Sequence, residues 1–340
     1  SILANREDPE AVLLVAPSDH LIPNTEYFHK IIIEGLAYLK QGKMVTLGIR
    51  PTYPETGYGY LQLDDPKSHA TNVLSFVEKP NIEKAKKMLS TGNYLWNAGI
   101  FLFRAKDMLL AFEKYKAKAL EYVSRSVDLA QNDLGFLRLE GSNWAKLEAI
   151  SIDYAIMERV GNLIAIPFDS KWSDLGGWDA VWSETSKDKN GNATSDGAFA
   201  IECNNTLLRS ENTSQKIVGL GLNEIIAISM SDAVLVAHKE MAQDVKKVVK
   251  HLKLNNVSQA EIFPKDHRPW GWFESLVLSD RFQVKRICVK PGAALSLQSH
   301  HHRSEHWIVV SGTAKVTVED EVKLLQEGQS VYVPLGAVHR

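Results

Sequence analysis

The first half of the chain alternates short apolar runs with segments whose apolar residues recur at helical spacing. Residues 11–16 form a continuous apolar run, as expected of a strand that is covered on both faces. In residues 25–39 the apolar positions lie three and four apart, Asn24 or Thr25 can cap a helix, and Gly42 stands where that helix would end. The pattern repeats, with strands predicted at 45–49, 74–77, 100–103 and 163–166, and helices at 82–89, 106–130 and 151–160. This alternation predicts an open α/β sheet.

The pattern of hydrophobic and polar residues changes near residue 190. Short strand-like runs separated by Asn, Ser, Gly and Asp turns predict a β-rich region, and an amphipathic helix is predicted at about 241–252. After Pro264 a third region, rich in strands and turns, runs to the end. The predicted domains are therefore residues 1–190, 191–262 and 263–340.

Composition narrows the class of protein without identifying it. The chain has 340 residues, 44% of them hydrophobic and 24% charged, which is typical of a globular protein. The formal net charge is −2 and Lys and Arg are spread along the chain, so neither nucleic acid nor a membrane is an expected partner. Two cysteines, Cys203 and Cys288, are too few for a disulfide framework and suit a reducing cytoplasm.

Two acidic residues follow predicted strands in the first region. Asp19, in the segment APSDH, comes directly after the apolar run 11–16, and Asp174 lies in the glycine-bearing segment WSDLGGW. Ligands of open α/β sheets bind at the carboxyl ends of strands, and two carboxylates there can hold Mg²⁺ between phosphates. Taken alone, Asp19 is equally explained as a helix cap, and a glycine loop between a strand and a helix is a common connection.

Three further segments of the first region carry candidate binding groups. Residues 56–60 (TGYGY) can bring backbone against a sugar ring, residues 76–80 (FVEKP) place an acid beside a base, and residues 96–100 (WNAGI) offer an amide to a hydroxyl. Each segment has a simpler interpretation when it is considered alone. The first is also a hairpin turn, the second a surface ion pair worth under about 1 kcal/mol, and the third a turn before a strand.

In their order, the segments APSDH, TGYGY, VEKP, WNAGIFLF, SIDYAIMER and WSDLGGW closely resemble the sugar-nucleotide pyrophosphorylases, specifically the bacterial mannose-1-phosphate guanylyltransferases, over residues 11–182. The resemblance implies a Rossmann-like nucleotidyltransferase domain with a mixed sheet. It implies that Asp19 and Asp174 hold the catalytic Mg²⁺. The positions that contact the sugar phosphate in that family correspond to Gly59, Glu78, Lys79 and Asn97. The implied reaction joins mannose 1-phosphate to the α-phosphorus of GTP, giving GDP-mannose and pyrophosphate.

The resemblance has one gap. The family opens with a glycine-rich loop of the form GGxGxRLWP that cradles the triphosphate, and no such segment occurs among these 340 residues. We therefore expect the chain to be truncated before Ser1, and the cupin resemblance described below predicts a truncation after Arg340 as well. We also expect this chain to be nearly inactive with GTP and mannose 1-phosphate, and a form that carries the loop, called here the loop-bearing form, to be active.

The third region holds two histidine-bearing segments. Residues 292–312 and 328–339 resemble the paired cupin motifs, in which hairpin strands direct His and Glu toward one divalent metal. The set implied here is Gln298, His300, Glu305 and His339, which suits Zn²⁺ or a similar ion. The alternative is a solvated His-rich loop. His301, His302 and His306 are interpreted as mostly outward-facing or as neighbours of the ligands.

The spacing Gln-x-His, with residues 268–271 (RPWG) and 282–286 (FQVKR), is similar to the isomerase domain of two-function guanylyltransferase/isomerases. The resemblance implies interconversion of mannose 6-phosphate and fructose 6-phosphate. That domain continues beyond the position of Arg340, so a partial cupin β-barrel with doubtful isomerase activity is expected. The region 191–262 corresponds to a β-rich connecting domain, and homo-oligomerisation through it is a hypothesis.

Two other functions remain open from the sequence. One is a regulatory, sugar-binding protein in which a cupin sensor is joined to an inactive nucleotidyltransferase fold. The other is a pyrophosphorylase for another hexose 1-phosphate, such as glucose 1-phosphate with UTP or dTTP. The presence of both Asp19 and Asp174 favours an enzyme over the first alternative, because an inactive site has no need of two metal carboxylates.

Overall fold

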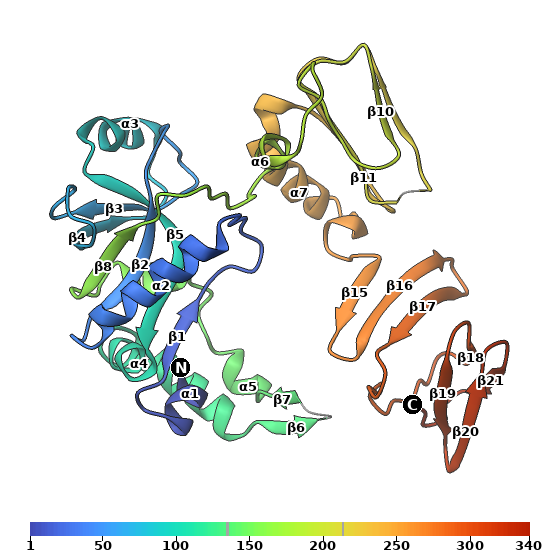
Figure 1. Ribbon diagram of the computed structural model, residues 1–340. Helices are drawn as coiled ribbons and strands as arrows, with labels where there is room; N and C mark the ends of the chain where they lie inside the picture. Colours follow the sequence, from blue (N-terminus) through green and yellow to red (C-terminus); the bar gives the residue numbers. More distant parts are fainter. Residues whose placement is uncertain (134–135, 213) are drawn as a thin grey trace. The chain divides into compact units, whose positions relative to one another are not determined.

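The computed structural model describes residues 1–133, 136–212 and 214–340 (Figure 1), which form two compact units, residues 1–186 and 187–340. No helix of the described residues combines the length and the apolar character that a bilayer crossing requires. The elements of the first unit are α1 (Ile2–Glu7), β1 (Val12–Val15), α2 (Thr25–Leu39), β2 (Met44–Ile49), β3 (Tyr60–Leu63), β4 (Thr71–Val77), α3 (Ile82–Thr91), β5 (Tyr94–Arg104), α4 (Ala105–Asp128), β6 (Gln131–Asp133), β7 (Phe136–Arg138), α5 (Gly141–Trp144), the π-helical turn η1 (Asp153–Met157), β8 (Leu163–Pro167) and α6 (Trp178–Glu184).

The core of the first unit is a six-stranded mixed sheet in the order β1-β5-β2-β8-β4-β3. Strands β2 and β8 pair in parallel, whereas β5 runs antiparallel to β1, β2 and β3. Alternate side chains of β5 point to opposite faces of the sheet. Ile100 and Leu102 pack with Ile31 of α2 on one face. Phe101 and Phe103 pack with residues of α4 and η1 on the other. The predicted α/β fold with a mixed sheet is confirmed.

The directions of these strands bring several chain segments to one edge of the sheet. Strands β1, β2 and β8 run the same way, so their carboxyl ends lie at the same edge. At this edge Ile49, Trp96, Tyr60 and Val77 oppose one another across β2, β5, β3 and β4. The residues that flank this row are therefore placed together, and most of the candidate site residues are among them.

Strand β5 carries an irregularity next to this edge. Its pairing with β2 shifts between Thr46 and Gly48, which oppose Phe101 and Asn97, so β5 has two extra residues there. Gly99 lies within the bulge at φ 67°, a conformation that glycine adopts without steric cost. Bulges of this kind redirect neighbouring side chains and are common beside active sites.

Two helices differ from the pattern-based predictions. The helix predicted at 151–160 contains the π-helical turn η1, whose residues Ala155, Ile156 and Met157 are buried. The helix predicted at 106–130 is present as α4 but is interrupted at Lys116, which has φ −146° and ψ 48°. Hydrophobic spacing reports the buried face of a helix and does not report such local changes in hydrogen bonding.

The second unit begins with short strands on successive turns of the chain, called coils below, that pair mostly in parallel. Its elements are β9 (Ala193–Thr194), β10 (Ala198–Ile201), β11 (Leu207–Ser210), β12 (Ile217–Leu220), β13 (Ile225–Ser229), β14 (Val234–His238), η2 (Lys239–Asp244), α7 (Val245–Leu254) and η3 (Ser258–Ala260). Strand β10 pairs with β12, and β11 lies between β9 and β13 and pairs with both, all in parallel. The buried Asn192 links successive coils, because its Nδ2 donates to Cys203 O at 2.8 Å and its Oδ1 accepts from Thr206 N at 3.1 Å.

The rest of the second unit consists of antiparallel strands. They are β15 (Lys265–Arg268), β16 (Gly271–Leu278), β17 (Gln283–Val289), β18 (Glu305–Ile308), β19 (Thr313–Val318), β20 (Glu321–Gln326) and β21 (Ser330–Val333). They form the sheets β15-β16-β17, β18-β21 and β19-β20. At Gly271 an added Cβ would lie 1.8 Å from Cys288 O, so only glycine allows β16 and β17 to approach so closely. The predicted β-rich middle and cupin-like carboxyl-terminal part are confirmed.

Candidate active site and metal centre

The segments that carry Asp19 and Asp174 pair with each other. Leu21 N donates to Ser173 O at 2.8 Å, and Ser173 N donates to Leu21 O at 3.1 Å. Trp172 Nε1 also donates to His20 Nδ1 at 3.3 Å, although the two residues are 152 positions apart in the chain. His20 follows Asp19 and Trp172 lies two residues before Asp174, so this bond also connects the two segments. Two distant segments, one after β1 and one after β8, are thus joined next to the two predicted acids.

Both acids act electrostatically on the same imidazole. Burial lowers the pKa of His20, and the negative charges of Asp174 and Asp19 partly offset that effect. The two carboxylates are therefore close enough to one side chain to share its electrostatic environment.

The carboxylate of Asp174 is held through one of its oxygens. Tyr58 donates its hydroxyl to Asp174 Oδ1 at 2.8 Å, and Gly176 N donates to the same oxygen at 3.1 Å. Burial first, and then the bond to Asp174, raise the pKa of Tyr58, so its hydroxyl stays protonated and can only strengthen this bond. Leu175 takes φ 48°, a conformation that side-chain-bearing residues seldom adopt and that is often found at functional sites.

Gly59 and Glu78 face each other across β3 and β4. A Cβ added to Gly59 would lie 2.6 Å from Glu78 Oε2, so glycine leaves the room that this carboxylate occupies. Burial raises the pKa of Glu78, and the neighbouring Lys79, whose Nζ lies 3.1 Å from Glu78 Oε1, partly offsets this. Lys79 has φ 46°, and its backbone N donates to Tyr58 O at 3.2 Å.

Asn97 completes the group at this edge of the sheet. Its backbone N donates to Gly59 O at 2.8 Å, which connects β5 to the turn before β3. Its side chain accepts from Thr46 Oγ1 and Gly99 N at 3.1 and 3.2 Å and donates from Nδ2 to Asp153 Oδ1 at 3.0 Å. The four predicted sugar-phosphate positions are thus neighbours in the structure, and Tyr58 connects them to Asp174.

An aromatic-walled cleft lies beside these residues within the first unit. Its volume is about 720 Å³, within the range of small-molecule sites. Tyr58 and Trp96 pack edge to face at 5.2 Å between ring centroids, and Tyr58 and Trp172 do so at 5.5 Å. The cleft is also lined by Ser173, which precedes Asp174, and by Arg50, which forms a bidentate pair with Asp169. It has room for a planar or sugar-bearing ligand beside Tyr58, whose hydroxyl donates to Asp174.

Two contributors to this site, Tyr58 and Asp153, are not evident from the sequence alone. Both lie inside motifs that were recognised, TGYGY and SIDYAIMER. Tyr58 looks like part of a turn, and Asp153 looks like a polar position at the start of a helix. Their contacts to Asp174 and Asn97 span 116 and 56 residues, so only the folded chain reveals them.

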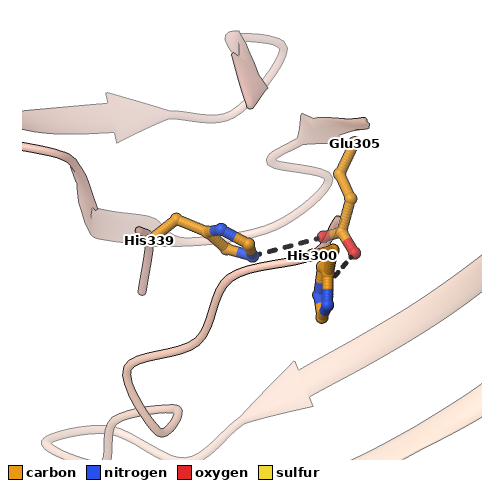
Figure 2. Close-up of side chains that lie close together, drawn as sticks. All are labelled: His300, Glu305 and His339. Atoms are coloured by element: carbon orange, nitrogen blue, oxygen red, sulfur yellow. Dashed lines mark ion pairs between the residues drawn. The ribbon is translucent and has the colours of Figure 1, made fainter. Parts of the chain in front are cut away.

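A second cluster lies in the carboxyl-terminal strands (Figure 2), formed by His300, Glu305 and His339. One ligand atom from each lies within 4.8 Å of the others, with His300 Nε2 at 3.1 Å and His339 Nε2 at 3.7 Å from oxygens of Glu305. The Nδ1 of His339 lies 2.9 Å from Ala337 O, so that nitrogen carries the proton and Nε2 presents its lone pair. His339 is 1% exposed, and its Nε2 has no hydrogen-bond partner among the described residues.

This arrangement fits a divalent metal. A buried imidazole nitrogen that faces a carboxylate without a hydrogen bond needs a partner, and two imidazoles with one carboxylate suit Zn²⁺ and related ions. Glu305 is fixed from both sides, by Trp307 Nε1 and Arg303 Nε, each at 2.8 Å. Burial opposes ionisation of Glu305, but these bonds outweigh it and lower its pKa.

The remaining histidines and Gln298 can now be placed. Gln298 and His339 form an antiparallel bridge through two backbone hydrogen bonds of 3.0 and 2.8 Å, so Gln298 adjoins the cluster. Glu305 and Trp307 are partly buried on β18, whereas His306 between them is exposed and packs near Tyr332. His301 and His302 are exposed as well, and the cluster therefore draws on one histidine of the three-residue run.

Known proteins match along the whole chain. The family model Nucleotidyl transferase matches residues 2–191, MannoseP isomerase/GMP-like beta-helix domain matches 197–252, and Mannose-6-phosphate isomerase C-terminal matches 255–340. The Xanthan biosynthesis protein XanB of Xanthomonas campestris pv. campestris (strain B100) is 43% identical over 337 residues, which cover 99% of this chain and 71% of that protein. The chain belongs to the bacterial mannose-1-phosphate guanylyltransferases with a carboxyl-terminal mannose-6-phosphate isomerase domain.

Other similar proteins support the same family assignment. Mannose-1-phosphate guanylyltransferase of Escherichia coli (strain K12) is 38% identical over 346 residues, covering 100% of this chain and 72% of that protein. Among solved structures, one described as mannose-1-phosphate geranyltransferase from Thermus thermophilus aligns with a TM-score of 0.64 at 28% identity, covering 74% of this chain and 72% of that one. The family predicted from the ordered motifs is confirmed.

Proposed function

We propose that the first unit transfers a guanylyl group from GTP to mannose 1-phosphate. An oxygen of the sugar phosphate forms a bond to the α-phosphorus of GTP, the bond from that phosphorus to the β-phosphate oxygen breaks, and pyrophosphate leaves. The observation that carries this proposal is the pairing of the Asp19 and Asp174 segments through Leu21 and Ser173 at the edge of the sheet. Carboxylates so placed are suited to hold Mg²⁺, which supplies charge neutralisation at the phosphates when bound.

The residues of the chain have distinct tasks under this proposal. Among the described residues, the bonds that Asp174 accepts from Tyr58 and Gly176 go to Oδ1, which leaves Oδ2 for the metal. Lys79 is exposed and can turn from Glu78 to the sugar phosphate. Glu78 and Asn97 offer an acceptor and an amide to sugar hydroxyls, and the bare backbone at Gly59 leaves room for the ring. Alignment of this kind accounts for much of the catalysis that phosphate chemistry requires.

The proposal is tested by a substrate panel with the loop-bearing form. GTP, UTP and dTTP are each combined with mannose 1-phosphate and glucose 1-phosphate, and pyrophosphate release is measured in the presence of Mg²⁺. We expect GTP with mannose 1-phosphate to give the highest kcat/KM. A preference for glucose 1-phosphate with UTP or dTTP would assign another pyrophosphorylase activity. No turnover with any pair, together with binding of a sugar phosphate, would support the regulatory alternative.

Replacing Tyr58 with phenylalanine is expected to weaken Mg²⁺ binding about three- to tenfold, because the loss of one hydrogen bond leaves Asp174 less well oriented. The ring and its packing on Trp96 and Trp172 are kept. Mn²⁺ titration followed by electron paramagnetic resonance gives the affinity in the loop-bearing form. Tyr60→Phe is the matched control, since the Tyr60 hydroxyl bonds to the backbone of Glu55. Equal Mn²⁺ affinities in Tyr58→Phe and the parent protein would contradict the role given to Tyr58.

We further propose that the cupin part interconverts mannose 6-phosphate and fructose 6-phosphate at a divalent metal, with Zn²⁺ as the first candidate. The buried Nε2 of His339, which has no hydrogen-bond partner in the described part of the chain, carries this proposal. His300, Glu305 and His339 would hold the ion, and Gln298 is proposed as the fourth ligand because its backbone pairs with His339. Polarisation of the substrate oxygens is the chemistry that such an ion supplies when bound.

Three features of organisation are also proposed. The division into domains 1–190, 191–262 and 263–340 follows the change from α/β to coiled parallel strands and then to antiparallel strands. Cytoplasmic location is supported by the free thiols of Cys203 and Cys288. Self-association through the β-rich middle remains a hypothesis that light scattering tests.

A further inference from the structure

The amide of Asn97 has a fixed orientation. The backbone N–H of Gly99 can only donate, so the atom that receives it at 3.2 Å must be the Asn97 oxygen, Oδ1. Thr46 Oγ1 lies 3.1 Å from the same oxygen. The NH₂ group is therefore directed the other way, where its Nδ2 lies 3.0 Å from Asp153 Oδ1. One of its two N–H bonds is directed at Asp153. The other has no hydrogen-bond partner among the described residues and remains for a ligand.

Asp153 is held at that position by an unusual turn. It is the first residue of η1, in which Glu158 N donates to Asp153 O at 3.0 Å, a bond that spans five residues. The next apolar residues of the turn, Ala155, Ile156 and Met157, are 3%, 0% and 2% exposed and anchor the turn in the core. A π-helical turn places one side chain out of step with an ordinary helix and is frequent at functional sites.

The surroundings of Asp153 make it part of the same site. Burial raises the pKa of Asp153, whereas the bond from Asn97 and the charge of Lys79 oppose that rise. The charge of Asp153 in turn helps to raise the pKa of Glu78, although burial is the main cause. Asp153 is thus within electrostatic reach of Glu78 and Lys79 as well as in contact with Asn97. An ionised carboxylate that is partly removed from water near another acid lowers the stability of the fold unless favourable contacts offset this cost.

We propose that Asp153 is a positioning residue for sugar 1-phosphate recognition, acting through the amide of Asn97. It accepts one N–H of Asn97, and the β5 bulge supplies Gly99 N to hold the oxygen, so that the second N–H is presented to a hydroxyl of the sugar. This inference rests on the proposed role of Asn97 in binding the sugar phosphate.

The test is a double-mutant cycle in the loop-bearing form, with Asp153→Ala, Asn97→Ala and both together. We expect each single variant to raise the KM for mannose 1-phosphate about tenfold while the KM for GTP stays within about twofold. Because Asp153 acts through Asn97, the double variant should be no worse than Asn97→Ala alone. Asp153→Asn keeps an acceptor oxygen and should recover most of the loss. Tyr154→Ala is the control for the turn, since Tyr154 is exposed on η1.

The outcomes separate this inference from the proposed function. Additive losses in the double variant, or an unchanged KM in Asp153→Ala beside a raised KM in Asn97→Ala, would overturn the role of Asp153 and leave that of Asn97 standing. An unchanged KM in Asn97→Ala would overturn the proposed sugar contact and the inference with it. If Asp153→Ala does not fold, Asp153→Leu fills the volume without an acceptor and is subject to the same expectations. Calorimetric titration with mannose 1-phosphate gives the same comparison without turnover.

Discussion

Replacing Asp174 with asparagine is expected to lower the kcat of guanylyl transfer in the loop-bearing form by about a thousandfold or more. The substitution preserves the size of the side chain and an oxygen that accepts from Tyr58 and Gly176, and it removes the charge that a phosphate-bound cation requires. Asp19→Asn should have an effect of the same order, because the two segments are joined at Leu21 and Ser173. Pyrophosphate release at saturating GTP and mannose 1-phosphate measures the change.

The matched control for these variants is Asp64→Asn. Asp64 is an exposed aspartate after β3, so the same chemical change there should leave kcat within about twofold. Circular dichroism and thermal unfolding establish that all three variants are folded. A kcat for Asp174→Asn within tenfold of the parent value would mean that Asp174 does not hold the catalytic cation. The same result for both Asp19→Asn and Asp174→Asn would remove the basis for the transferase site.

The sequence points to a candidate site most directly where an acidic residue follows a strand end. Asp19 follows a strand with a continuous apolar run, and Asp174 lies in a glycine-bearing loop after another strand, so the rule for strand ends accounts for the pairing of their segments. That the two carboxylates hold a cation stays a prediction. Gly59, Glu78 and Asn97 are different, because each of their segments has a simpler interpretation when it is considered alone and only the resemblance implies their roles. Their proximity depends on the register Tyr60–Trp96 and Tyr60–Val77, which no local pattern encodes.

What the sequence does not reveal are the contacts that orient these groups. The bulge in β5 that directs Asn97 arises from a register shift opposite Thr46 and Gly48. The π-helical turn at Asp153 has the same apolar spacing as an ordinary helix over its short length. Tyr58 reaches Asp174 across 116 residues. Each depends on which segments are paired in the folded chain, and hydrophobic periodicity carries information about burial only.

The cupin cluster differs from the first site in this respect. Its histidines are easy to find in the sequence, but the sequence does not show which of them are metal ligands. A strand's alternation explains why Glu305 faces inward and His306 outward on β18. It does not explain why His300 joins the cluster while His301 and His302 are exposed, because residues 296–304 include no named strand. Their placement depends on the bridge between Gln298 and His339, which brings the second motif against the first.

Replacing His339 with alanine is expected to reduce the divalent metal bound by the chain from about one equivalent to less than a tenth, corresponding to a loss of affinity of about a hundredfold or more. His339 contributes the buried Nε2 that has no other partner among the described residues, and Nδ1 is already committed to Ala337 O. The site would retain only His300 and Glu305 of its three-residue cluster. Metal content after Zn²⁺ loading and dialysis, measured by mass spectrometry, gives the stoichiometry.

His306→Ala is the control that makes this result specific. It removes an imidazole from the same histidine-rich segment, yet His306 is exposed and lies near Tyr332, so the metal content should not change. Co²⁺ absorption adds a second readout, because a tetrahedral site with imidazole ligands gives visible bands that surface histidines do not. Since an ion that binds only the folded state stabilises it, Zn²⁺ should also raise the unfolding temperature of the parent and of His306→Ala, and not that of His339→Ala. Equal metal loss in both variants would instead indicate adventitious binding by the histidine run, and the metal centre assigned to His300, Glu305 and His339 would then be wrong.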